Sequence, residues 1–146
     1  MQQGVYPKAI ARLQGGIDHP QLRGMVKFFP KRDGVMIEAE IFGLPKTETG
    51  FFAFHIHEGG SCGHGDLSGT GGHYNPGGTM HPNHGGDLPP LLSDHGKAYM
   101  KVFSDRIRVE ELIGRTVVIH SDPDDFRTQP AGNAGKKIAC GVIRTI

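Results

Sequence analysis

Two features of this sequence predict an all-β fold: its content of glycine and proline, and its short apolar runs. The 146 residues include 23 glycines and 10 prolines, more than an average chain carries, which indicates many turns between short strands and argues against long helices. A chain of this length, with 36% hydrophobic residues, can bury one core. We therefore expect a single domain that spans residues 1–146.

The strand candidates are apolar runs bounded by glycine, proline or aspartate. In chain order they are Ala9–Leu13, Leu22–Phe29, Val35–Phe42, Phe51–His57, Ala98–Phe103, Thr116–His120 and Ile138–Ile143. The alternation in the third run is imperfect, because Glu38 and Glu40 share a face with Met36 and Phe42. This pattern predicts a half-exposed strand.

The character of the chain changes between Gly59 and Pro90, where glycine, histidine and proline replace aliphatic residues until Leu88. A structureless loop of this length is unusual inside a compact domain, and such loops are generally functional or held by something other than a core. Metal coordination would hold it. A second polar loop, Ser121–Lys137, follows one predicted strand and precedes the last one.

The charge pattern excludes some classes of partner. The formal net charge is +1 and no run of like charges stands out, so nothing marks a nucleic-acid surface, and an anionic ligand has to be attracted locally. No segment approaches the roughly 18 apolar residues of a membrane span, and the first residues lack the apolar core of a signal peptide. An intact product of this sequence is expected in the cytoplasm, and one from which a signal peptide was removed is secreted or periplasmic.

The histidines are concentrated in one part of the chain: six of the nine fall between His55 and His84. His55 and His57 lie two residues apart on a predicted strand, so both side chains project from the same face and are close enough to share one metal ion. Such a pair is a weak signal by itself, since surface or core histidines are more common than ligands.

The glycine-rich loop adds a second candidate group of ligands, His73, His81, His84 and Asp87. Three imidazoles and one carboxylate make a closed set of the kind that tetrahedral zinc accepts. The alternative is a solvated, histidine-rich loop without a metal ion.

His120 ends another predicted strand, at its junction with a loop, and could approach His55 and His57 from there. Imidazole ligands suit copper as well as zinc, and a site without a closing carboxylate can remain open to a small substrate. The other three histidines match no ligand pattern and are interpreted as structural or surface residues: His19, His64 and His95.

The two cysteines, Cys62 and Cys140, lie far apart in the sequence. A disulfide between them would close a loop of about 78 residues and restrict the unfolded chain. Two free buried thiols are the alternative, which the reducing conditions of a cytosol favour.

Several segments together resemble the copper-zinc superoxide dismutase family, in its bacterial, short-loop form. These segments are FAFHIHEGGSC, GGHYNP, HPNHGGDLPPL, GRTVVIHSDPDDF and GNAGKKIACGVI, and they cover most of the chain. The resemblance implies an eight-stranded Greek-key β-sandwich or barrel, immunoglobulin-like, with long metal-binding and active-site loops. It also implies a disulfide between Cys62 and Cys140.

The resemblance implies two metal ions that share one ligand. Copper would be bound by His55, His57, His73 and His120, and zinc by His73, His81, His84 and Asp87. His73 would bridge both ions and act in catalysis. Asp124 stands where the family has an aspartate that joins a copper ligand to a zinc ligand, and such hydrogen bonds fix imidazole tautomers.

The sequence departs from the family pattern in two places. Lys137 stands where the family has its active-site arginine, so positive charge is retained but the two-pronged guanidinium is lost. The loops are also shorter than in the eukaryotic forms, and Arg127, Lys136 and Lys137 could provide a local positive funnel.

The function implied by the resemblance is the disproportionation of superoxide into dioxygen and hydrogen peroxide, by a monomer or homodimer. Lys137 and His73 are its expected catalytic residues. One alternative is a redox-silent module that only binds copper or zinc. A zinc hydrolase is disfavoured, because Glu58 follows His57 without the second histidine of an H-E-x-x-H motif.

Overall fold

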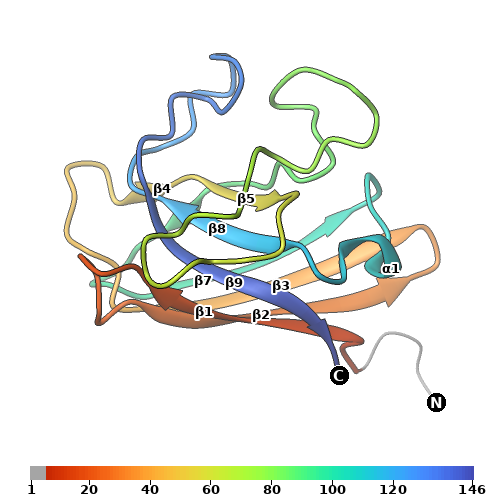
Figure 1. The fold of residues 1–146 in the computed structure, drawn as a ribbon, viewed down its shortest axis with the longest axis horizontal. Coiled ribbons are helices and arrows are strands. Elements are labelled where there is room, and N and C mark those ends of the chain that lie inside the picture. Colours follow the sequence, from red (N-terminus) through yellow and green to blue (C-terminus); the bar gives the residue numbers. More distant parts are fainter. Residues whose placement is uncertain (1–5) are drawn as a thin grey trace.

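The computed structural model describes residues 6–146 and is built almost entirely of β-strands (Figure 1). The strands are β1 (Ala9–Gly15), β2 (Arg23–Lys31), β3 (Gly34–Phe42), β4 (Phe51–Phe52), β5 (Phe54–His57), β6 (Leu91–Leu92), β7 (Ala98–Ser104), β8 (Thr116–His120) and β9 (Lys137–Thr145). One short helix, α1 (Val109–Leu112), precedes β8. The predicted all-β class is thus confirmed. Within residues 6–146, no helix has the length and apolar character needed to cross a membrane.

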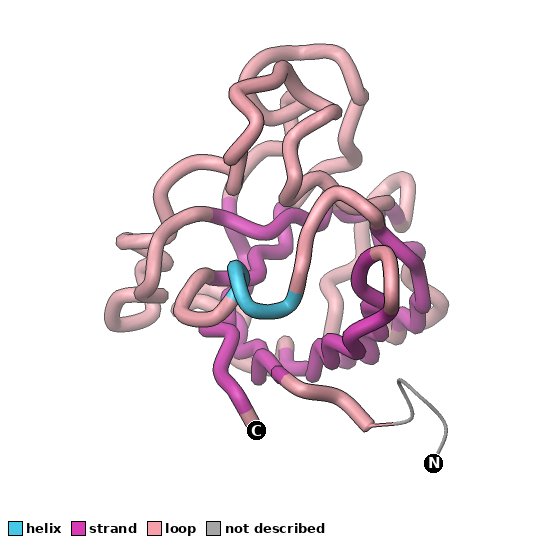
Figure 2. Tube along the Cα trace, turned by 90° about the vertical axis from the view of Figure 1, so that its right-hand side faces the viewer, coloured by secondary structure: helices cyan, strands magenta, loops and turns pink. Residues whose placement is uncertain are grey.

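Seven strands form one antiparallel sheet in the order β5-β8-β9-β1-β2-β3-β7, and β4 pairs with β6 in a two-stranded sheet. Neighbours that are distant in sequence, such as β1 and β9, make this a crossover topology. The large sheet curls around the core, and Figure 2 shows the strands arranged around it in a half-barrel. This architecture agrees with the expected sandwich or barrel.

The alternation of strand β3 follows the prediction. Val35, Ile37, Ala39 and Ile41 are fully buried, while the opposite face, which carries Glu38, Glu40 and Phe42, is partly or fully exposed. The inward side chains of β3 join those of β1, β2 and β8 in one apolar cluster. Burying apolar surface stabilises the fold by about 25 cal/mol for each Å², and this is the main force that closes the sheet.

Three local features differ from the sequence prediction. The expected strand Phe51–His57 is broken at Ala53, whose N–H donates to Asp122 O at 3.0 Å and whose carbonyl accepts from His120 N–H at 2.9 Å. The chain therefore pairs with β6 before Ala53, as β4, and with β8 after it, as β5. The strand Leu91–Leu92 and helix α1 were not predicted, because elements of two and four residues are too short to show a period.

Two loops project from the same side of the barrel, as Figure 1 shows in green and blue. We call residues 58–90 the histidine loop and residues 121–136 the C-terminal loop. The histidine loop is tied to β9 by the disulfide Cys62–Cys140, which confirms the implied pairing and excludes the two free thiols. The two loops meet through two hydrogen bonds between the backbone of His81 and the side chain of Gln129, on the side of β5 and β8, the strands that carry histidines (Figure 1).

Candidate metal centre

Strand β5 delivers His55 and His57 to the base of the two loops. All four residues of this strand are buried, since its two faces are covered by the core and by the loops. His55 and His57 face the same way, as their spacing predicted, and their ring centroids are 6.3 Å apart. Strand β8 pairs with β5 and ends at His120, which is also buried.

The first group of ligand atoms comes from His55, His57, His73 and His120, and all of these atoms lie within 4.8 Å of one another. The Nε2 atoms of His57 and His120 are 3.2 Å apart. Zinc–nitrogen bonds are about 2.0–2.1 Å long, so two nitrogens at this separation can bind one ion of that size. The structure thus brings together the four residues expected to bind copper.

Hydrogen bonds on the outer side of the rings fix which nitrogen faces inward. His57 Nδ1 lies 2.8 Å from Gly71 O, which can only accept, so Nδ1 carries the proton and Nε2 keeps its lone pair. His55 Nε2 lies 2.8 Å from a carboxylate oxygen of Asp124, which leaves Nδ1 free to coordinate.

Four buried imidazole nitrogens have no hydrogen-bond partner among the described residues: His55 Nδ1, His73 Nε2, His81 Nδ1 and His120 Nδ1. A buried polar atom without a partner is costly, and coordination of a metal ion removes that cost for the nitrogens of His55, His73 and His81, whereas His120 faces the first group with its other nitrogen, Nε2. His81 Nδ1 lies 3.0 Å from Asp87 Oδ2 without the geometry of a hydrogen bond, as expected for two ligands of one ion. The residues present therefore fit metal ions.

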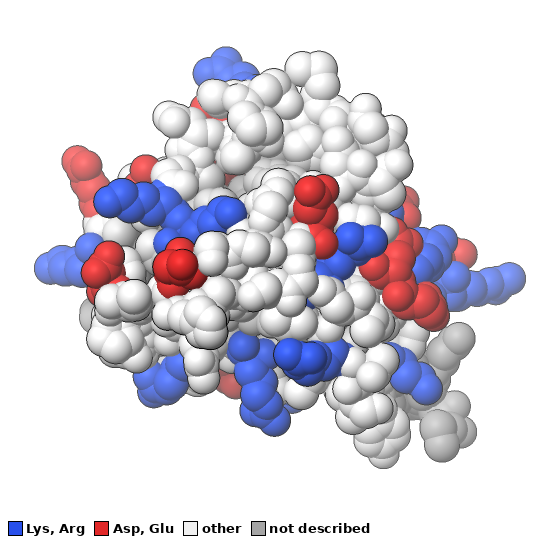
Figure 3. All heavy atoms as spheres, viewed as in Figure 1, with Lys and Arg blue, Asp and Glu red and all other residues white. Residues whose placement is uncertain are grey.

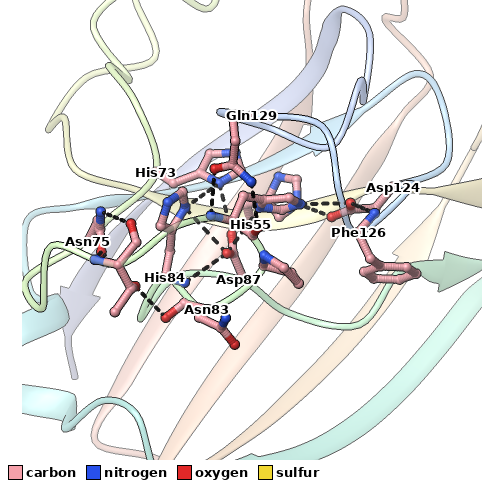
Figure 4. Close-up of polar contacts among 12 residues, drawn as sticks. His55, His73, Asn75, Asn83, His84, Asp87, Asp124, Phe126 and Gln129 are labelled. Atoms are coloured by element: carbon pink, nitrogen blue, oxygen red, sulfur yellow. Dashed lines mark hydrogen bonds and ion pairs between the residues drawn. The ribbon is translucent and has the colours of Figure 1, made fainter.

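The second group surrounds Asp87. His73 Nδ1 lies 2.8 Å from Asp87 Oδ1 and 3.2 Å from His84 Nδ1, while His84 Nδ1 lies 3.3 Å from Asp87 Oδ2 (Figure 4). His81 Nδ1 completes the set. All four residues expected to bind zinc are thus near one another, and His73 presents one ring nitrogen to each group.

Distance alone also places His55 with His73, His81 and Asp87. The hydrogen bonds favour His84 instead, because His55 Nε2 is bonded to Asp124 and its other nitrogen lies in the first group. The backbone N–H of His84 donates to Asp87 Oδ2 at 2.9 Å, which holds the Asp87 carboxylate beside His84.

Asp124 joins the two groups from behind. Its Oδ2 accepts from His55 Nε2 and its Oδ1 from His81 Nε2, both at 2.8 Å, as Figure 4 shows for His55. The C-terminal loop can wrap this carboxylate because Gly132 has no side chain: a Cβ there would lie 2.0 Å from Asp124 Oδ1 and 2.7 Å from His81 Nε2. Gly132 also has φ +70°, a conformation that favours glycine.

Lys137 is half-buried at the start of β9, directly opposite His120 in the register of β8 and β9. Its ammonium group donates to Thr70 Oγ1 and, at 3.3 Å, to Gly71 O. Gly71 O is also the acceptor for His57. The cation is thereby fixed beside the first group of histidines.

The comparison with known proteins decides what kind of centre this is. Residues 22–143 match the family described as copper/zinc superoxide dismutase (SODC). The chain belongs to this family. The Cu-Zn superoxide dismutase 2 of Aquifex aeolicus is 38% identical over an alignment of 136 residues that covers 83% of this chain and 78% of the relative. The Cu-Zn superoxide dismutase of Deinococcus radiodurans is 33% identical over 147 residues (86% and 79%), and Cu-Zn superoxide dismutase A of Xenopus laevis is 36% identical over 152 residues (93% and 96%).

Membership in the copper/zinc superoxide dismutase family implies copper and zinc as cofactors, and the two groups of ligand atoms can hold two ions. The relatives include bacterial proteins and an extracellular superoxide dismutase of Rattus norvegicus. His95 is 98% exposed and outside both groups, in agreement with its interpretation as a surface residue.

Burial sets the charge of the centre in the metal-free chain. Together with the smaller effect of neighbouring histidines, burial lowers the pKa of His57 to about 3 and that of His120 to about 2. Burial would raise the pKa of Asp124, but hydrogen bonds from His55 and His81 outweigh it and lower that pKa to about 2. Neutral imidazoles and ionised carboxylates are the forms that bind metal ions.

These pKa values predict that the metal-free protein loses stability as pH falls. The unfolded chain protonates His57 and His120 near pH 6.5, while the folded chain does not do so until about pH 3 and about pH 2. The unfolded state therefore binds more protons throughout this window. Urea unfolding of metal-free protein should give a midpoint that decreases steadily from pH 7 to pH 4, and a constant midpoint would contradict these pKa values.

Replacing Asp124 with asparagine should weaken the binding of both metal ions by about 10–100-fold, because an amide cannot hold His55 and His81 as the carboxylate does. Competition with a chelator measures this affinity. Asp94→Asn is the matched control, since Asp94 and His95 form another Asp–His pair but are 89% and 98% exposed. Equal loss in both variants would mean that the bridge from Asp124 is unimportant.

Three residues of this centre gave no signal in the sequence: Thr70, Gly71 and Gly132. Gly71 acts through its carbonyl oxygen and Gly132 through the lack of a side chain, and neither role leaves a residue pattern. Gly132 lies in the segment GNAG, which contributed to the family resemblance without an assigned role.

Proposed function

We propose that this chain disproportionates superoxide, with copper held by His55, His57, His73 and His120, and zinc held by His73, His81, His84 and Asp87. The observation that carries the proposal is the pair of adjacent ligand groups that share the ring of His73, beside the fixed cation of Lys137. Two superoxide ions and two protons give one dioxygen and one hydrogen peroxide. Copper supplies one-electron redox chemistry to this reaction, whereas zinc has no redox chemistry.

Lys137 attracts the superoxide anion to the first group of histidines. An ammonium group that is half-buried opposite His120 acts at short range, where the surrounding dielectric is lower than in water. The local charge matters because the net charge is only +1 and charges of both signs are interspersed on the face shown in Figure 3. Arg127 and Lys136 are exposed on the C-terminal loop and add to the local positive charge.

His73 supplies the proton path. Its Nε2 is buried without a partner, so this atom can take up a proton and pass it to the peroxide that forms. Its Nδ1 is held by Asp87 and His84, which keep the ring in one orientation during the transfer. Asp124 holds His55 and His81 in the same way from the opposite side.

Reconstitution with copper and zinc, followed by measurement of superoxide loss at known metal content, tests this proposal. The control is the same protein loaded with zinc alone, which lacks a redox-active ion and should be inactive. Copper-dependent loss of superoxide supports the dismutase. Full copper occupancy without any loss would overturn it and favour the redox-silent metal-binding module.

Lys137→Arg should raise kcat/KM for superoxide by about twofold to fivefold, because a guanidinium can donate two hydrogen bonds to a small oxyanion where an ammonium offers a point charge. Lys136→Arg is the matched control, since Lys136 is exposed and adjacent. Steady superoxide flux assays at several ionic strengths measure the rates. An unchanged rate in Lys137→Arg would contradict a role for this cation in binding the anion.

We further propose that residues 1–146 form one domain that works as a monomer or homodimer and binds neither nucleic acid nor membrane. The disulfide Cys62–Cys140 is typical of oxidising compartments. Of the two locations expected from the sequence, it favours the secreted or periplasmic one over the cytoplasm.

A further inference from the structure

Thr70 lies in the histidine loop, and its hydroxyl contacts the ammonium group of Lys137. The side chain of Thr70 is fully buried, and Lys137 Nζ donates a hydrogen bond to its Oγ1. A second, longer hydrogen bond of 3.3 Å joins the same Nζ to Gly71 O. The cation at the start of β9 is thus held by two consecutive residues of a loop that is distant in sequence.

The backbone around Thr70 is fixed independently of Lys137. Gly59 N–H donates to Thr70 O at 2.7 Å, and a Cβ on Gly59 would lie 2.0 Å from Gly69 O, so only glycine allows this close approach. The disulfide at Cys62 holds the same segment to β9. The hydroxyl of Thr70 is therefore presented at a set position to which the ammonium group adapts.

An ammonium group at the end of a flexible stem needs such contacts to occupy one position. Lysine has three N–H donors that rotate freely, whereas the guanidinium of arginine is a rigid fork. Thr70 and Gly71 accept two of the three donors of Lys137. The third N–H remains for an anion. The ammonium group also has a fixed position relative to His57, because His57 donates to the same oxygen, Gly71 O, at 2.8 Å.

We propose that Thr70 is a positioning residue for Lys137, and that its hydroxyl holds the ammonium group where it can bind a small anion beside the first group of histidines. The effect of Thr70 on catalysis rests on the proposed function. The contact itself does not depend on turnover and can be measured in the metal-free chain.

Two substitutions separate the hydroxyl from the rest of the side chain. Thr70→Val removes the hydroxyl and keeps the shape, while Thr70→Ser keeps the hydroxyl. Thr116→Val is the matched control, because Thr116 is also fully buried and its Oγ1 donates to Gly59 O at 3.1 Å without contacting Lys137. Loss of one buried threonine hydroxyl is thereby compared at two positions near the same glycine.

The first measurement is the rate at which acetic anhydride modifies Lys137 in the metal-free protein, followed by peptide mass spectrometry with the exposed Lys46 as internal reference. We expect Thr70→Val to accelerate the modification of Lys137 by about threefold or more, since one net hydrogen bond corresponds to roughly that factor. Thr70→Ser and Thr116→Val should match the original protein.

The second measurement is the affinity of the copper- and zinc-loaded protein for azide, a small monoanion, followed by visible absorption. Thr70→Val should weaken azide binding by about threefold to tenfold, and Thr70→Ser should restore it. In superoxide assays, Thr70→Val should mainly raise KM, because displacing the ammonium group leaves the histidines in place.

The outcomes distinguish this inference from the proposed function. Faster modification of Lys137 and weaker azide binding in Thr70→Val alone support the positioning role. Equal modification rates and equal azide affinities in all four proteins overturn it, as does an equal change in Thr116→Val. If copper-loaded protein fails to remove superoxide, the proposed function is wrong, and the modification rates still decide the role of Thr70.

Discussion

Replacing His73 with alanine is expected to lower the rate of superoxide removal by at least about 100-fold. Residues that only support a metal ligand typically cost 10–100-fold when they are replaced, and His73 contacts both ligand groups directly. The substitution leaves three candidate ligands in each group, so both ions can still bind. It removes the shared ring, together with the unpartnered Nε2 that would carry the proton.

The measurement is superoxide loss normalised to the copper content of each preparation, so that weaker metal binding is not counted as lost chemistry. His95→Ala is the control, because His95 is 98% exposed and outside both ligand groups. A His73→Ala protein that retains copper and more than about a tenth of the original rate would show that the shared imidazole is dispensable. The proton delivered to peroxide would then have to come from solvent.

The strands that carry the centre could be predicted from the sequence because they have strong local signals. The continuous apolar run of β8 predicts a strand buried on both faces, and Thr116–His120 was predicted with its observed bounds. The alternation of β3, which lies outside the centre, likewise predicts its one buried face. The break at Ala53 could not be predicted, since it depends on hydrogen bonds to Asp122 and His120, which are distant in sequence. A single-sequence pattern contains no information about such pairings.

Among the ligands, too, some could be predicted from local spacing and others depend on contacts between distant parts of the chain. The spacing of His55 and His57 on a strand indicates a shared face, whereas the approach of His73 to both groups depends on how the histidine loop folds back. That folding is fixed by backbone contacts, such as Tyr74 N–H to Ile56 O at 2.9 Å. Reasoning from the residues proposed the second group of ligands but left a solvated loop as an alternative, and the family resemblance supplied the role of His73 as the ligand that both ions share.

Removing the disulfide should lower the free energy of unfolding of the metal-free protein by about 4.5 kcal/mol, according to the chain-entropy relation for a closed loop of this size. Cys62 and Cys140 are separated by 78 residues, so their bond restricts more than half of the unfolded chain. The comparison is between the original protein and the double variant Cys62→Ala, Cys140→Ala, both without metal, by urea unfolding.

The same variant should bind metal ions less tightly, because the disulfide holds the segment that presents Gly71 to His57 and Lys137. Metal ions that bind only the folded state raise its stability, so the metal-loaded double variant should have a higher free energy of unfolding than the metal-free double variant. The matched control is a single alanine at Met100, a partly buried side chain of β7 at the core edge that belongs to neither loop. A double variant that loses less than about 1 kcal/mol would mean that the unfolded chain is already compact around this segment, and that the loop is held chiefly by its backbone hydrogen bonds.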